Sequence, residues 1–68
     1  MGLQPHEQRV FDEYEALMSR IVRLDGFFRT DACKALEELD RELLHEQHEY
    51  MTAYANILSE RIARFRRG

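Results

Sequence analysis

The chain has 68 residues, of which 44% are hydrophobic and 34% charged, and its formal net charge is −3. This length allows one small domain over residues 1–68, too apolar for a disordered chain and too charged for a membrane span. Domains that bind nucleic acid are usually basic, so with this net charge we expect no nucleic acid as a partner. Because the chain is too charged for a membrane span, we expect no membrane partner either.

The first predicted element is an amphipathic helix over about residues 5–28. Pro5 suits the first turn of a helix, and Glu7 suits its positive N-terminal end. Apolar residues then recur at spacings of three and four, which places them in one stripe along a helix. The stripe comprises Val10, Tyr14, Leu17, Ile21, Leu24 and Phe28.

A turn or short helix is expected over about residues 29–36. Thr30 or Asp31 can cap whatever helix follows, because both side chains carry an oxygen that accepts from backbone N–H groups. Cys33 is the single cysteine and cannot form an internal disulfide. Together with an N-terminus that lacks an apolar leader, this predicts a cytoplasmic protein.

A second long helix is predicted over about residues 37–66, and its apolar residues fall on one face. They are Leu36, Leu39, Leu43, Leu44, Met51, Tyr54, Ile57, Leu58, Ile62 and Phe65. The expected fold is therefore an all-α helical hairpin with two long antiparallel helices. Because two helices cannot enclose a core, we expect the hairpins to assemble into a homo-oligomeric helical bundle, a dimer or higher.

Three polar residues project into the stripe of the second helix: Asp40, Gln47 and Arg61. Burial of an unpaired charge is costly, so each of these side chains needs a hydrogen-bonding or oppositely charged partner. One interpretation is an inter-helix salt bridge or a polar pair that sets the register. The other is a polar cleft at the subunit interface, where Arg61 would bind an anion and Gln47 would read a hydrogen-bonding edge.

Aromatic residues offer a further set of ligand contacts. Phe27 projects beside several arginines, Arg20 among them, and this combination can stack a base and clamp a phosphate. The alternative is that Phe27 packs against the following segment while the arginines are solvated. Tyr14 and Tyr54 lie within their stripes, where they either fill the core or shape a pocket.

The histidines do not predict a metal site. Glu42 and His45 have the spacing of a di-iron carboxylate motif, and His48 follows three residues later. On a helical wheel, however, His45 points away from the apolar stripe, whereas a bundle metal site needs inward ligands. No nucleophile, base and metal converge either, so we expect no cofactor and no enzymatic activity.

The order of the helical residues resembles a known group of proteins. The two motifs are Glu13-Tyr14-x-x-Leu17-x-x-Arg20-Ile21-x-x-Leu24 and Leu43-Leu44-x-x-Gln47-x-x-x-Met51-x-x-Tyr54-x-x-Ile57-Leu58-x-x-Arg61-Ile62. They resemble a family of very small hypothetical helical proteins of tailed phages related to crAss-like phages. Members of that family tend to have a Ser-led acidic helix start where Glu37-Glu38 stands here.

As a class, short helical phage proteins are similar to the anti-defence sponges that hold nucleotide immune signals between subunits. This similarity implies sequestration, without cleavage, of an ADP-ribose-derived molecule or a cyclic dinucleotide in the host cytoplasm. The residues expected to bind that ligand are Arg61, Arg20, Gln47, Tyr54, Tyr14 and Phe27. The alternative is a helical protein-interaction module that binds or inhibits a host protein.

Overall fold

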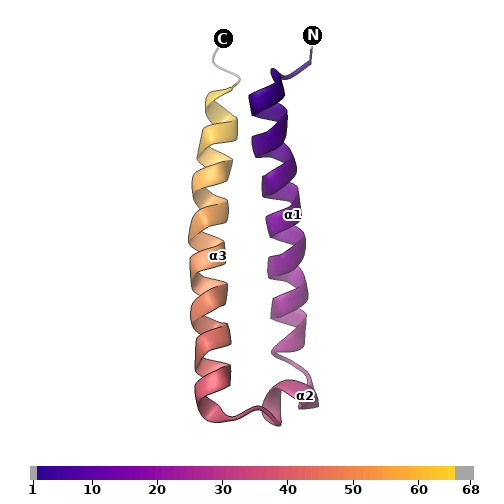
Figure 1. Ribbon diagram of the computed structural model, residues 1–68, viewed down its shortest axis with the longest axis vertical. Helices are drawn as coiled ribbons and strands as arrows, with labels where there is room; N and C mark the ends of the chain where they lie inside the picture. Colours follow the sequence, from indigo (N-terminus) through magenta and orange to yellow (C-terminus); the bar gives the residue numbers. More distant parts are fainter. Residues whose placement is uncertain (1, 66–68) are drawn as a thin grey trace.

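The computed structural model describes residues 2–65, and within this range the chain is all-helical with three helices and no strand. Helix α1 (Pro5–Phe27) and helix α3 (Glu38–Arg64) lie side by side and antiparallel, and the short α2 (Asp31–Lys34) connects them at one end (Figure 1). The hairpin measures 49 × 16 × 15 Å. None of these helices combines the length and apolarity that a membrane crossing requires.

The starts of α1 and α2 follow from local hydrogen bonding. Pro5 is the first residue of α1, and the backbone N–H of Gln4 donates to Glu7 Oε1 at 2.9 Å. Thr30 is the N-cap of α2, where its Oγ1 accepts from the backbone N–H of Cys33 at 3.2 Å. The predicted capping role of Thr30 is therefore confirmed, and residue 66, the expected end of the second long helix, lies outside the described residues.

The connection between α2 and α3 is held by one side chain. The guanidinium of Arg41 reaches back to donate to the backbone carbonyl of Leu36, and to that of Lys34 at 3.2 Å. Carbonyls at the end of a helix have no partner within it, so an arginine from the next helix satisfies them. This contact fixes where α3 begins relative to α2.

The core is a narrow strip between α1 and α3. Its buried residues are Val10 and Leu17 of α1 and Ala55 and Leu58 of α3, and Leu58 is fully buried. Partly buried side chains pack around this strip: Tyr14, Met18, Ile21, Met51, Ile62 and Phe65. The predicted stripe of the first helix therefore lies in the contact with α3.

The predicted apolar face of the second long helix is only partly covered by α1. Leu58 and Ile62 face α1, but Leu39, Leu43 and Ile57 are 63%, 54% and 56% exposed. The apolar arc of α3 is too wide for one neighbouring helix to cover, so it divides into an inner and an outer part. Asp40, Gln47 and Arg61, which the helical wheel placed inside the stripe, are exposed, since they lie on the outer part.

Aromatic and imidazole rings gather where the hairpin turns. The ring of Phe28 stacks on His45 with centroids 4.1 Å apart and meets His48 at 5.5 Å. His48 Nε2 also lies 4.0 Å from Asp25 Oδ1. His45, which was predicted to point away from the apolar stripe of its helix, is exposed, and its imidazole stacks on Phe28, the C-cap residue of α1.

Candidate ligand-binding surface

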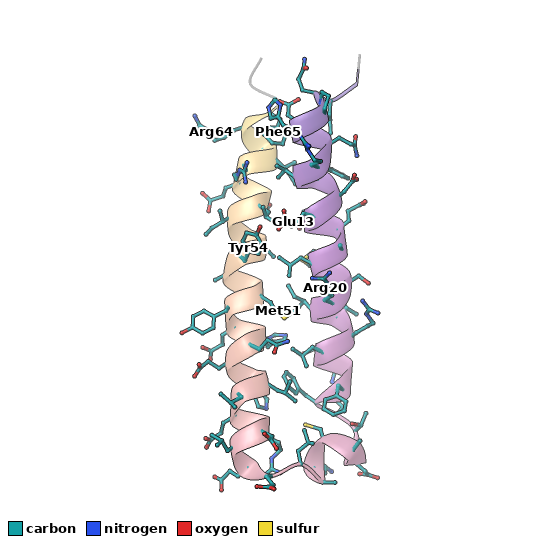
Figure 2. All side chains as sticks on the ribbon, in the orientation of Figure 1. Glu13, Arg20, Met51, Tyr54, Arg64 and Phe65 are labelled. Atoms are coloured by element: carbon teal, nitrogen blue, oxygen red, sulfur yellow. The ribbon has the colours of Figure 1, made fainter. Side chains whose placement is uncertain are left out.

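One contact links the two long helices through polar groups. The hydroxyl of Tyr54 on α3 donates to Glu13 Oε2 on α1, between residues 41 positions apart in the chain. Figure 2 shows the two side chains pointing toward one another across the hairpin, with Arg20 further along α1. This bridge marks one long side of the molecule.

The electrostatics of the bridge keep Tyr54 protonated. The hydrogen bond to Glu13 raises the pKa of Tyr54 above its ordinary value, and desolvation and the negative charge of Glu13 act in the same direction. The positive charge of Arg61 lowers the pKa of Tyr54, which places that guanidinium within electrostatic reach of the phenol. At neutral pH the site therefore presents a neutral phenol at Tyr54.

Helical spacing extends this cluster along both helices. Arg20 follows Glu13 by seven residues on α1, and Arg61 follows Tyr54 by seven on α3, so each pair shares one face of its helix. Gln47 lies seven residues before Tyr54 on the same face. We call these five residues the Tyr54–Arg61 surface: Glu13, Arg20, Gln47, Tyr54 and Arg61.

The cations of the Tyr54–Arg61 surface are available to a ligand. Arg20 and Arg61 are both exposed, and neither forms an ion pair with any of residues 2–65. By contrast, Arg29 near the turn pairs with Asp25 at 3.2 Å. The amide of Gln47 makes a single weak contact, from Nε2 to Met51 Sδ at 3.8 Å.

The other two predicted ligand residues lie elsewhere in the fold. Tyr14 is half-buried and packs against the core strip, so its ring belongs to the contact between α1 and α3. Phe27 is half-buried at the last position of α1. The stacked phenyl ring near the turn is that of Phe28, one residue further along the chain.

Glu13 is a site residue that the sequence reasoning did not include. Its position beside the stripe of α1, seven residues from Arg20, was the available signal. That signal places Glu13 on a face of α1 but does not show which residue of α3 it meets. The partner Tyr54 follows only from the rotation of α3 against α1.

The surface is open rather than hollow. Residues 2–65 of a single chain enclose no pocket, and they contain no group of three side chains arranged to hold a metal ion. A small ligand gains affinity when most of its surface is covered. A ligand bound here therefore needs cover from outside this chain.

Comparison with known proteins gives two matches. The Sequestin family model matches residues 4–64, which include the whole Tyr54–Arg61 surface. An uncharacterized 7.5 kDa protein from the denB-rIIB intergenic region of Enterobacteria phage T4 is 34% identical over 61 residues, covering 90% of this chain and 95% of that protein. No solved structure shows a significant match. The expected resemblance to a family of very small phage proteins is confirmed at this level.

Proposed function

Because the chain belongs to the Sequestin family, we propose that it is a phage counter-defence protein that sequesters a nucleotide immune signal. The family name suggests a sequestering role, and the ligand class comes from the chemistry of the surface together with the similarity to sponges. The ligand would be an ADP-ribose-derived molecule or a cyclic dinucleotide. The relationship to crAss-like phages stays a prediction.

The observation that carries the proposal is that two exposed arginines, one on either side of the Tyr54–Glu13 bridge, form no ion pair with any of residues 2–65. A guanidinium donates two parallel hydrogen bonds to a phosphate. Arg20 and Arg61 lie on opposite sides of the bridge, each seven residues along its helix, so each would bind a different part of an extended ligand. The carboxylate of Glu13 suits the hydroxyls of a ribose, which donate to it. Phosphate donors and a ribose acceptor on one surface favour a nucleotide over a simple anion.

Two further groups complete the recognition. The ring of Tyr54 is 42% exposed and offers a face on which a base can stack. The amide of Gln47, whose contact within the chain is weak, can pair with a base edge or a ribose hydroxyl. A phenol whose pKa is raised is a poor general base at neutral pH, which suits binding without cleavage.

The open surface also supports placement of the ligand between subunits. In this proposal a homo-oligomer in the host cytoplasm supplies the cover that the single hairpin lacks. No cofactor, nucleic acid or membrane takes part.

Binding is tested by thermal shifts of the purified protein with cyclic dinucleotides, ADP-ribose, its cyclic isomers and its amino-acid conjugates. A ligand at 100 times its dissociation constant adds about 2.7 kcal/mol of stability. In a chain this small the midpoint then rises by several degrees. Recovery of the intact nucleotide after heat denaturation of the complex would distinguish sequestration from cleavage.

Arg61→Ala is expected to weaken binding about ten- to a hundredfold, which corresponds to the roughly 1.5–3 kcal/mol of a hydrogen bond to a charged group. Arg29→Ala is the matched control, because it removes an exposed arginine near the turn, away from the surface. Arg61→Lys keeps the charge but loses the forked donor geometry, so it should restore binding only in part. Equal affinities for Arg61→Ala and the wild-type protein would refute the assignment of Arg61.

The exposed apolar side chains of α3 favour a second candidate function, a helical module that binds a host protein. This function predicts a stable complex with a host protein and no thermal shift with any nucleotide. A nucleotide shift that Arg61→Ala removes would exclude it as the main activity.

A further inference from the structure

Helix α3 carries an apolar face that no part of the described chain covers. We call Leu39, Leu43, Tyr50 and Ile57 the outer face of α3; these side chains are 63%, 54%, 69% and 56% exposed. Leu43, Tyr50 and Ile57 are spaced by seven residues, so they form a straight row along the helix. A seven-residue apolar repeat is typical of a helix that packs against another helix.

The surface area of the single chain supports the need for a partner. The accessible surface is 5585 Å² for 8.2 kDa, whereas a monomeric protein of this mass exposes about 4500 Å². The excess is about 1000 Å², and each partner in a stable complex of standard size buries about 800 Å². The excess accessible surface of the hairpin is therefore large enough for an interface of standard size.

The charges along α3 are distributed unevenly. The acidic part lies at the start of the helix, whereas its last turn contains the basic residues Arg61 and Arg64. The carboxylates of the cap and the first half are Glu37, Glu38, Asp40, Glu42, Glu46 and Glu49. Two such helices attract each other when they run antiparallel and repel when they run parallel.

We propose that the outer face of α3 packs against the same face of a second copy of this chain, with the two α3 helices antiparallel and the two-fold axis at Tyr50. Tyr50 then meets its own equivalent, and Leu43 of each copy meets Ile57 of the other. The basic last turn of each α3 lies beside the acidic start of its partner's α3. An interface related by a two-fold axis uses the same patch twice, which this self-complementary row allows.

The inference deepens the proposed function and rests on it for the ligand. Gln47, Tyr54 and Arg61 form a row of their own, spaced by seven residues and adjacent to the row of Leu43, Tyr50 and Ile57. A second α3 on the outer face therefore becomes a wall beside the Tyr54–Arg61 surface. The start of the partner's α3, around its residue 39, would then lie opposite Arg61.

The interface is tested by the mass of the protein in solution without any nucleotide, measured by light scattering on a sizing column. We expect the wild-type protein at twice 8.2 kDa. Ile57→Lys places a charge against Leu43 of the other copy and should reduce the mass to one chain, while circular dichroism shows the helices retained. Val22→Lys is the matched control, because Val22 is 65% exposed on α1, outside the proposed contact.

The direction of packing is tested by disulfide cross-linking of single-cysteine additions. Residues 43 and 57 lie 14 positions apart, or about 21 Å along a helix. Leu43→Cys mixed with Ile57→Cys should therefore form a mixed dimer, and neither variant should cross-link to itself. The native Cys33 is buried and does not interfere. Self-cross-linking of Leu43→Cys would overturn the antiparallel arrangement.

The outcomes separate this inference from the proposed function. A monomeric wild-type protein, or dissociation by Val22→Lys to the same degree as by Ile57→Lys, would overturn the interface. A dimer that binds no nucleotide would support the interface and refute only the proposed function. Nucleotide binding at wild-type affinity by monomeric Ile57→Lys would overturn the role of the partner in the site.

Discussion

Helices α1 and α3 face each other in one hairpin but distribute their apolar side chains differently. On α1, Val22 is the single large apolar side chain that is more than one-third exposed, and Val10 and Leu17 are buried. On α3, Leu58 is fully buried, while a second set of apolar residues is exposed. The apolar side chains of α1 therefore serve the hairpin contact almost alone, whereas those of α3 serve that contact and an outward surface as well.

The difference teaches how a chain this small can combine folding with binding. A hairpin with four residues in its main core cluster has little stability to spare, and on α3 the residues of that cluster belong to the inner part. The outer part of α3 contributes little to the isolated hairpin and is free to carry other contacts. Three residues of the Tyr54–Arg61 surface, Gln47, Tyr54 and Arg61, lie on this less constrained side.

The largest effect that tests the comparison is expected at Leu58. Leu58→Ala removes the one fully buried side chain and should cost about 2–5 kcal/mol, which leaves most of the protein unfolded. The neighbouring Ile57→Ala changes an exposed side chain and should cost less than about 0.5 kcal/mol in dilute solution. Urea denaturation followed by circular dichroism measures both, and equal losses would contradict the division of α3 into two faces.

A smaller effect is expected from protein concentration. If the outer face of α3 binds a second copy, each tenfold increase in concentration above the dissociation constant adds about 1.4 kcal/mol of stability per dimer, or about 0.7 kcal/mol per chain, and the melting temperature rises. Tyr50→Glu should abolish this dependence, because it places like charges at the two-fold axis. Val22→Glu, on α1, should leave the dependence unchanged. Melting curves over a hundredfold range of concentration would show the difference.

The fold of α1 was predictable because its apolar residues form a narrow stripe. A stripe of that width has one way to face a neighbouring helix, and Val10, Leu17 and Ile21 lie where the spacing places them. The cap at Thr30 was predictable for a similar reason, since its hydrogen bond to Cys33 is local. Periodicity and capping are therefore sufficient for the helices and the turn.

The rotation of α3 was not predictable from its own sequence. Its apolar arc is wide enough that either part of it could face α1, and the choice depends on the turn, where Arg41 anchors the start of α3. For this reason Arg61 and Gln47 were assigned to a buried stripe although they are exposed. The bridge from Tyr54 to Glu13 was missed on the same ground, because it joins residues 41 positions apart.

The smallest effect is a change in titration rather than in stability. Glu13 raises the pKa of Tyr54, so this tyrosine should titrate above its ordinary value of about 10. A raised pKa in the folded state means that the bridge favours folding below the pKa of the unfolded state. This contribution is lost as the pH rises through the folded pKa. Nuclear magnetic resonance of ring-labelled tyrosine, with Tyr54→Phe to identify the signal, measures the titration.

Two variants give shifts of opposite sign in that experiment. Glu13→Ala removes both the hydrogen bond and the negative charge, so the pKa of Tyr54 should fall toward its ordinary value. Arg61→Ala removes the charge that lowers this pKa, so the value should rise further. Glu15→Ala is the matched control, because it removes an exposed carboxylate from the same helix. If the pKa of Tyr54 is unchanged in both Glu13→Ala and Arg61→Ala, Tyr54 interacts with neither residue. That result would refute the polar link between α1 and the outward side of α3.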